Sequence, residues 1–217
     1  MKNIILIAPA NAGKGTQAKL IQEKYNIPHI SMGELLRERR KIDDQIGRHI
    51  AETQDKGVLT DDSIVIEALK ERITQPDCKN GYILEGYPRT VKQLNLYKDL
   101  LNEIGMDFGV AISLEIPYEM LLERMLSRVT CEKCEKIYNL SYEKAKPKVD
   151  GICDECGGKL VRRSDDTEEA FKVRYQVYLD NINPLLEEFN KMGVLYTIDA
   201  SIDRDTTFKS IEAIIND

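Results

Sequence analysis

The fold is decided by the N-terminal stretch Met1-Lys2-Asn3-Ile4-Ile5-Leu6-Ile7-Ala8-Pro9-Ala10-Asn11-Ala12-Gly13-Lys14-Gly15-Thr16. Residues 4–7 form an unbroken, largely β-branched apolar run, which is typical of a buried parallel strand. The run leads into a loop of small residues, and a helical pattern follows from Gln17 to Tyr25. Backbone N–H groups, a helix start and the ammonium group of Lys14 can together surround an anion. The stretch therefore predicts a phosphate-binding loop.

The match to the phosphate-loop pattern G-x-x-x-x-G-K-[ST] is incomplete. Ala8 stands where the pattern has its first glycine, and the hydroxyl group comes one position late, at Thr16 after Gly15. Taken alone, the stretch is also compatible with an ordinary strand-to-helix turn that carries an exposed lysine. Other parts of the chain must decide between the two interpretations.

The composition indicates a soluble globular protein. The chain has 217 residues, of which 42% are hydrophobic and 31% are charged. This length suits one domain with an insertion. The formal net charge of -6 argues against a general nucleic-acid or membrane-surface binder, because such a protein needs a basic face. We therefore expect neither a nucleic-acid nor a membrane partner.

The sequence predicts a cytoplasmic protein. No apolar run approaches the roughly 18 residues of a membrane span. Met1-Lys2 followed by residues 4–8 imitates the start of a signal peptide, but the apolar part is too short and leads directly into the phosphate-binding loop. Four of the five cysteines form two C-x-x-C pairs, which is more typical of metal binding than of the disulfides of a secreted protein.

Strand and helix patterns alternate along most of the chain. Further strands are expected at residues 27–30, 81–86, 108–116 and 194–198, and helices at 33–53, 63–73, 91–104, 118–128 and 167–190. Such alternation predicts an α/β fold with a parallel sheet and helices on both faces. Ser31 and Glu34 have the spacing of a capping box. Arg124 and Arg128, four residues apart, are expected on one side of a helix.

The alternation stops between Val129 and Asp166, in a segment that has the composition of a small inserted module. Eighteen residues separate its two motifs, Cys131-Glu-Lys-Cys134 and Cys153-Asp-Glu-Cys156, a spacing that is typical of zinc sites. Four thiolates close a tetrahedron around one ion and leave no position for water, so the site would be structural. Iron, reduced free thiols and a redox pair are the alternatives to zinc.

These features together resemble the adenylate kinases, in the form with a long zinc-containing lid. The resemblance runs from Ile4 to about Ser201 and rests on the phosphate loop, the helix start at Ser31, the motif Gly86-Tyr87-Pro88-Arg89-Thr90 and the cysteine insertion. It implies a P-loop NTPase-like core at 1–30, 61–126 and 165–217, a segment that binds the nucleoside monophosphate at 31–60, and an inserted zinc-binding lid at 127–164. It also implies a monomer that catalyses the magnesium-dependent reaction ATP + AMP = 2 ADP.

The resemblance assigns residues to this site. ATP would be bound by Asn11, Ala12, Gly13, Lys14, Gly15, Thr16, Arg124, Arg128, Ile137, Tyr138 and Ile202. AMP would be bound by Met32, Arg37, Val58, Leu59, Thr60, Gly86, Tyr87, Pro88, Arg89, Gln93, Arg163 and Arg174. The catalytic set would be Lys14, Arg89, Arg124, Arg128, Arg163 and Arg174, and the zinc ligands Cys131, Cys134, Cys153 and Cys156. Arginine suits phosphate because it is always charged and can bind in a bidentate manner.

Three acidic residues near these positions also follow from the resemblance. Asp165 and Asp166 would anchor the closed lid, and Glu85 stands where the family usually has an aspartate near the waters of magnesium. The histidines His29 and His49 have no matching partners in the sequence, so they are interpreted as structural or surface residues.

Several residues depart from the family pattern, whose loop usually reads G-x-P-G-x-G-K-G-T. Asn11 replaces a glycine, but asparagine tolerates positive φ better than most residues. Ala8 matters only if its position needs a glycine conformation. Met32 stands where a threonine usually lies beside the acceptor base, so a kinase for another nucleoside monophosphate, such as UMP or CMP, remains an alternative. The altered loop also leaves open a nucleotide-binding or zinc-ribbon interaction protein without turnover.

Overall fold

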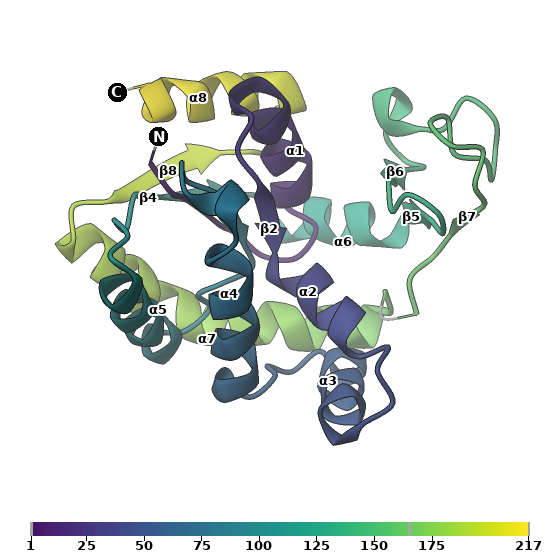
Figure 1. Ribbon diagram of the computed structural model, residues 1–217. Coiled ribbons are helices and arrows are strands. Elements are labelled where there is room, and N and C mark those ends of the chain that lie inside the picture. Colours follow the sequence, from purple (N-terminus) through teal and green to yellow (C-terminus); the bar gives the residue numbers. More distant parts are fainter. Residues whose placement is uncertain (1, 165, 217) are drawn as a thin grey trace.

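The computed structural model describes residues 2–164 and 166–216. Its centre is a parallel sheet of five strands in the order β2-β3-β1-β4-β8, seen in Figure 1. The strands are β1 (Ile4–Ile7), β2 (His29–Ser31), β3 (Ile83–Glu85), β4 (Val110–Glu115) and β8 (Leu195–Asp199). The predicted α/β class with a parallel sheet is confirmed.

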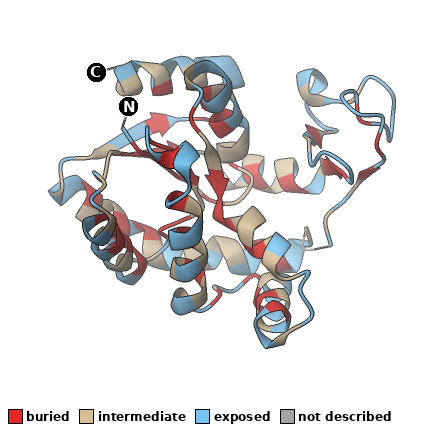
Figure 2. Cartoon of the chain, viewed as in Figure 1, coloured by how far each residue is buried: buried red, intermediate tan, exposed pale blue. Residues whose placement is uncertain are grey.

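Helices cover both faces of this sheet because its central strands are apolar on both sides. In β1, Ile4 and Leu6 belong to one core cluster, whereas Ile5 and Ile7 belong to the other. The first cluster includes residues of α1 (Lys14–Tyr25) and α8 (Arg204–Asn216). The second includes residues of α2 (Met32–Arg39), α3 (Gln45–Lys56), α4 (Asp62–Ile73), α5 (Val91–Ile104) and α7 (Glu168–Lys191). Figure 2 shows these buried residues along the sheet and the inner helix faces.

Most of the predicted elements are present, with shifted ends. The helix predicted from Gln17 begins at Lys14, directly after Gly13 in a left-handed conformation. The helix predicted at 33–53 is two helices, because residues 40–44 form a turn between α2 and α3. The predicted capping box is wrong: Ser31 is at the N-cap of α2 without a side-chain cap hydrogen bond, and Glu34 instead lies 3.8 Å from the guanidinium of Arg37. Helix α8 was not predicted.

The helix predicted at 118–128 also ends early. Helix α6 spans Tyr118–Leu126, and Arg128 begins strand β5 (Arg128–Cys131). Arg124 and Arg128 therefore do not lie four residues apart on one helix, which corrects the prediction. The change from helix to strand at this point is where the chain leaves the core.

The inserted segment forms a separate antiparallel sheet in the order β6-β5-β7. Its strands are β5, β6 (Ile137–Asn139) and β7 (Leu160–Val161). The 3-10 helix η2 (Glu143–Ala145) follows β6. A second 3-10 helix, η1 (Pro76–Cys78), belongs to the core and precedes β3. The hydrophobic cluster of this unit is small and consists of Val129, Cys131, Tyr138, Cys153 and Leu160. In Figures 1 and 2 this unit projects from the core and is mostly exposed.

Among the described residues, no helix is long and apolar enough to span a membrane.

Candidate active site

The phosphate loop follows β1 and has the backbone that its sequence requires. Asn11 has a φ of 65° and Gly13 a φ of 89°, both in the left-handed region. Asparagine is among the few residues that adopt this region readily, so it can replace the glycine of the pattern. Ala8 is not among the described non-glycine residues with positive φ. Its position therefore does not need a glycine conformation.

The side chain of Lys14 bends back over this loop. Its Nζ donates hydrogen bonds to the carbonyl oxygens of Ala8 and Pro9, at 3.0 and 2.8 Å. Burial lowers the pKa of Lys14 to about 8, while Glu85 opposes this change and the cations Arg89 and Arg128 add to it. A cation held in this way, with no carboxylate of the described residues in hydrogen-bond contact, favours an anion in front of the loop.

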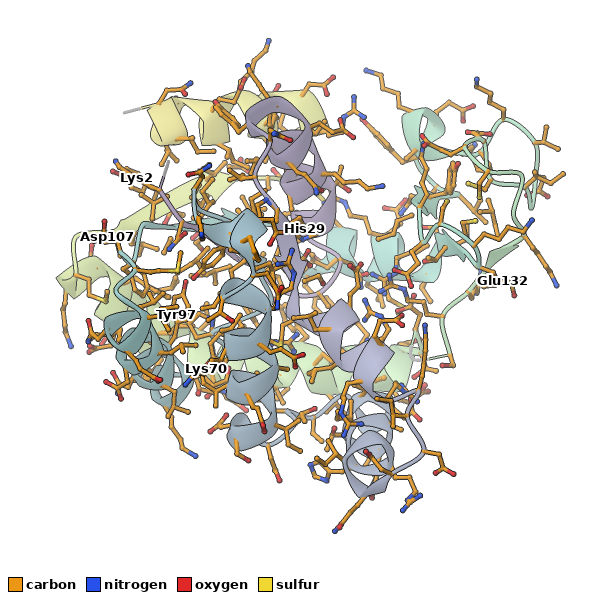
Figure 3. The ribbon with its side chains drawn as sticks, viewed as in Figure 1. Lys2, His29, Lys70, Tyr97, Asp107 and Glu132 are labelled. Atoms are coloured by element: carbon orange, nitrogen blue, oxygen red, sulfur yellow. The ribbon has the colours of Figure 1, made fainter. Side chains whose placement is uncertain are left out.

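Glu85 is the acidic residue of this site. Its Oε2 lies 3.0 Å from Nε2 of His29, and a Cβ atom on Gly15 would lie 3.3 Å from the same oxygen. Burial alone would raise the pKa of Glu85, but the hydrogen bond with His29 and the charges of Lys14 and Arg37 outweigh it, so the pKa is lowered. His29 was expected to be a structural or surface residue without a partner, and the structure gives it a partner in the carboxylate of Glu85. Sequence spacing gave no sign of the pair, because β2 and β3 bring it together. In Figure 3, His29 lies near the middle of the molecule.

A cleft of about 240 Å³ opens at the carboxyl ends of β1, β2 and β3. This edge is where open parallel sheets bind ligands. Six of the predicted cationic residues line the cleft: Lys14, Arg37, Arg89, Arg128, Arg163 and Arg174. They come from six separate parts of the chain, and the fold brings them to one cavity. Helix α7 adds wall residues that were not predicted, among them Val177, Tyr178, Ile182 and Leu185.

The cations influence one another across the cleft. Burial lowers the pKa of Arg89, even though part of its side chain is exposed, and Arg174 and Arg37 lower it further against the opposing effect of Glu85. Nε of Arg89 donates to the carbonyl oxygen of Gly86 at 2.8 Å. Nη2 of Arg174 donates to the carbonyl oxygen of Gln54 at 3.1 Å, which ties α7 to the end of α3. Such a concentration of positive charge in a net acidic chain fits a highly charged anionic ligand.

All of the residues expected around the acceptor nucleotide line this cleft: Met32, Arg37, Val58, Leu59, Thr60, Gly86, Tyr87, Pro88, Arg89, Gln93, Arg163 and Arg174. Met32 is only 2% exposed, so its thioether is part of the wall. The hydroxyl groups of Thr60 and Thr53 lie 2.9 Å apart, and that of Thr53 also donates to the carbonyl oxygens of His49 and Ile50. The hydroxyl of Thr60 is therefore held against α3.

Gln93 is held by two partners. Its Oε1 accepts from the backbone N–H of Arg89 at 2.8 Å, and its Nε2 donates to Oδ1 of Asp62 at 2.9 Å. Asp62 also accepts from Nζ of Lys92 at 2.8 Å. Asp62 is a residue that the sequence analysis missed, because only the packing of α4 beside α5 brings it to Gln93.

Other predicted site residues do not line this cleft. Ala12, Gly13, Gly15 and Thr16 lie in the loop and the first turn of α1. Arg124 is half-buried near the end of α6, where burial lowers its pKa and its carbonyl oxygen accepts from Nδ2 of Asn139. Ile137 and Ile202 are exposed, whereas Tyr138 is buried inside the inserted unit. Whether these residues contact a nucleotide stays a prediction.

Arg128 does line the cleft, and it is also paired at the base of the inserted unit. Its Nε donates to Oδ2 of Asp166 at 2.9 Å, and its Nη2 contacts Oδ1 of the same carboxylate. Asp165, which was expected to act beside Asp166, lies outside the described residues.

The four predicted metal ligands form one cluster. The sulfur atoms of Cys131, Cys134, Cys153 and Cys156 all lie within 4.8 Å of one another, with 3.4 Å between Cys131 and Cys156 and 3.5 Å between Cys134 and Cys153. These separations are too long for a disulfide. The range from 3.4 Å to the limit of 4.8 Å includes the roughly 3.8 Å edge of a tetrahedron with zinc–sulfur bonds of about 2.3 Å. The donor set and its geometry fit a structural metal ion.

Tyr138 supports this cluster from inside. Its hydroxyl group lies 3.4 Å from Sγ of Cys153 and accepts from the backbone N–H of Asp154 at 2.8 Å. The hydrogen bond from Tyr138 lowers the pKa of the Cys153 thiol, which favours the thiolate that a metal ion requires.

Comparison with known proteins identifies the family. The family model described as adenylate kinase matches residues 6–194. The chain is 43% identical to an adenylate kinase of Archaeoglobus fulgidus over 98% of this chain and 97% of that protein. It is 41% identical to adenylate kinases of Clostridium tetani and Methanosarcina barkeri, in each case over 98% of both chains. The chain therefore belongs to the adenylate kinase family.

Proposed function

We propose that this chain transfers the γ-phosphoryl group of magnesium-bound ATP reversibly to AMP, giving two ADP. The observation that carries the proposal is the arrangement of six cationic side chains around one cleft, directly in front of a phosphate loop. Transfer between two nucleotides places several phosphate groups in a single cavity, and their charge requires such a set. Membership of the adenylate kinase family supports the same reaction.

The donor side of the cleft would be the phosphate loop. Its backbone N–H groups at residues 11–16 and the ammonium group of Lys14 would hold the ATP phosphates. Arg124, Arg128, Ile137, Tyr138 and Ile202 are proposed to cover the donor nucleotide when the lid closes. Adenylate kinases use magnesium with ATP, and the carboxylate of Glu85, next to Gly15, is suitably placed to accept hydrogen bonds from waters of that ion.

The acceptor side would be formed by the walls around Met32 and Gln93. Arg37 and Arg89 are proposed to hold the AMP phosphate, and Gln93 to contact the base, with main-chain contacts from Val58 to Thr60 and from Gly86 to Pro88. Arg163 and Arg174 would stabilise the transferring group. Phosphoryl transfer needs little covalent help from protein, so in-line placement and positive charge around the equatorial oxygens are the main requirements.

The division of the chain into parts is proposed on the same basis. Residues 31–60 would close on the acceptor, and residues 127–164 would form a lid that excludes water, which otherwise competes as the acceptor. We propose that zinc occupies the four-cysteine site and folds the lid, because the hydrophobic cluster of this unit has only five residues. A monomer in a reducing compartment, the cytoplasm, is the proposed form, since four neighbouring free thiols suit such a compartment.

The test is a coupled assay of ADP formation from magnesium-ATP, with AMP, CMP, UMP, GMP or no acceptor in parallel. The expected result is fast turnover with AMP. Replacing Arg89 by Lys should lower kcat by about 100-fold, because a bidentate guanidinium is lost. Arg48, which is exposed outside the cleft, provides the matched control, and Arg48→Lys should leave kcat unchanged. Absence of turnover with every acceptor would refute the proposal.

A further inference from the structure

The amide group of Gln93 has a fixed orientation. A carboxylate can only accept hydrogen bonds and a backbone N–H can only donate. Asp62 therefore requires the NH2 end of the amide, and the N–H of Arg89 requires its oxygen end, in agreement with the contacts of 2.9 and 2.8 Å. A rotation of the amide by 180° would set donor against donor and acceptor against acceptor at once. The orientation thus follows from the chemistry of the two partners.

Two observations support this fixed orientation: Asp62 is ionised, and Gln93 is buried with its backbone held in place. Burial alone would raise the pKa of Asp62, but hydrogen bonds from Lys92 and Gln93 outweigh it and lower the pKa. Gln93 is 2% exposed. Its backbone is held on both sides, because its carbonyl oxygen accepts from the hydroxyl of Tyr87 and its N–H donates to Oγ1 of Thr90.

The free hydrogen-bonding capacity of this amide is directional. One hydrogen on Nε2 and one lone pair on Oε1 remain after the contacts with Asp62 and Arg89. They match a base edge on which an amino group lies beside an unprotonated ring nitrogen. Adenine and cytosine present that edge, whereas hypoxanthine, guanine and uracil present an oxo group beside a ring N–H, which is the reverse order.

We propose that Asp62 is a positioning residue that sets the amide of Gln93 to accept nucleoside monophosphates with an amino-bearing base and to reject those with an oxo-bearing base. The inference rests on the proposed function, in which Gln93 contacts the acceptor base. Asp62 itself does not touch the substrate. It acts by making one of the two orientations of Gln93 unfavourable, and its effect is therefore on selectivity.

Substrate pairs of equal size test the proposal on the unaltered enzyme. AMP is compared with IMP and CMP with UMP, each pair differing mainly in the donor and acceptor order of the base edge. AMP should exceed IMP in kcat/KM by at least about 100-fold, because the oxo-bearing base leaves buried polar groups unpaired, and CMP should exceed UMP. Equal values within both pairs would overturn the proposal. Failure of the proposed function is a different result, namely no turnover with any acceptor.

Variants then assign the selectivity to Asp62. Asp62→Asn replaces a group that can only accept hydrogen bonds by one that can also donate, so both orientations of the Gln93 amide become possible. The ratio of AMP to IMP in kcat/KM should therefore fall about tenfold. The change should come through KM for AMP, with little change in kcat. Asp62→Glu keeps a carboxylate and should restore most of the ratio. Lys92→Ala removes the other partner of Asp62, an exposed one, and should leave the ratio unchanged. An unchanged ratio in a folded Asp62→Asn enzyme, or an equal fall in Lys92→Ala, would refute the role of Asp62.

Discussion

Arg128 and Asp166 join the two ends of the inserted unit through a bidentate salt bridge. Arg128 is the first residue of β5, where the chain enters this unit, and Asp166 follows β7, where the chain returns toward α7. Their side chains are 16% and 2% exposed, so the pair is largely removed from water. A planar guanidinium that contacts both carboxylate oxygens fixes direction as well as distance. The salt bridge thus links the predicted donor-binding arginine to the base of the proposed lid.

Replacing Asp166 by Asn should lower the free energy of unfolding by about 3 kcal/mol, because it leaves the guanidinium of Arg128 largely buried without its counter-charge. KM for ATP should rise, since Arg128 would no longer be held at the cleft. Urea unfolding and steady-state kinetics measure the two effects. The control is Asp43→Asn, which breaks the exposed pair with Arg48 and should cost no more than about 0.5 kcal/mol. Equal losses in both variants would contradict the prediction.

The rate at low ATP concentration should fall as the pH rises through about 8. In the free enzyme, burial lowers the pKa of Lys14 from 10.5 to about 8, and only the protonated form can bind phosphate as a cation. The pH profile of kcat/KM for ATP reports groups of the free enzyme and should show this decline. Lys14→Arg cannot lose its charge in this range, so its weaker activity should lack the decline. A flat profile for the wild type would contradict the assignment.

The same group should make the nucleotide-free enzyme less stable at neutral pH than at pH 10. Between about 8 and 10.5 the unfolded chain binds the Lys14 proton more strongly than the folded one, so the contribution of this residue to stability rises with pH there. Below pH 8 the buried, protonated Lys14 lowers the free energy of unfolding by its full amount, about 3 kcal/mol at most. Lys14→Met should therefore be the more stable protein at pH 7, and this difference should shrink toward pH 10.5 in denaturant titrations.

Local patterns in the sequence were sufficient to predict much of this fold. The run from Ile4 to Ile7 is apolar on both faces, and only a central strand of a sheet with helices on both sides buries it completely. The two C-x-x-C motifs predicted the cysteine cluster, because each motif brings two sulfurs together by itself. Asn11 was expected to replace a glycine, and its φ of 65° shows why it can.

Contacts between distant parts of the chain could not be predicted from local sequence patterns. The Glu85–His29 pair and the Asp62–Gln93 pair each depend on the placement of two elements whose register no local pattern gives. The end of α6 was misplaced because Ser127 and Arg128 are compatible with a helix, whereas pairing of β5 with both β6 and β7 favours a strand. Helix α8 was missed although Phe208, Ile211, Ile214 and Ile215 repeat at the intervals of an amphipathic helix, so the sequence did carry a signal for it.

Ala8 and Asn11 in the phosphate loop should have little effect on activity compared with glycine at the same positions. Oδ1 of Asn11 is buried without a hydrogen-bond partner in the described structure, so Asn11→Gly removes an unsatisfied group and should stabilise the protein by about 1 kcal/mol. Asn11→Ala should be less stable than Asn11→Gly by about 1–2 kcal/mol because of the left-handed backbone. The Ala8→Gly, Asn11→Gly double variant should stay within about tenfold of wild-type kcat, since Ala8 has no positive φ and asparagine tolerates the left-handed conformation at position 11. An increase of several orders of magnitude would contradict this account.

Metal removal should unfold the inserted unit while the core stays folded. The buried cluster of this unit consists of five residues, of which Cys131 and Cys153 are themselves predicted ligands, so the unit has almost no core of its own. Verified removal of the metal by a chelator should lower the first thermal transition, and backbone amides of β5 and β6 should lose protection from hydrogen exchange. Unchanged melting after complete removal would contradict the structural role. Elemental analysis of the purified protein decides between zinc and iron.

Tyr138→Phe separates two roles for this residue. Tyr138 was predicted to contact ATP, but its buried hydroxyl group lies between Sγ of Cys153 and the N–H of Asp154. Loss of a group that supports a metal ligand typically lowers metal affinity 10- to 100-fold, and the pKa of the Cys153 thiol should rise without its hydrogen-bond donor. KM for ATP should change less than about twofold once the metal is saturating, because the ring that fills the core is kept. Competition with a chromophoric chelator measures the affinity, and Tyr142→Phe, at an exposed position, is the control. A raised KM for ATP with unchanged metal affinity would instead make Tyr138 a nucleotide contact.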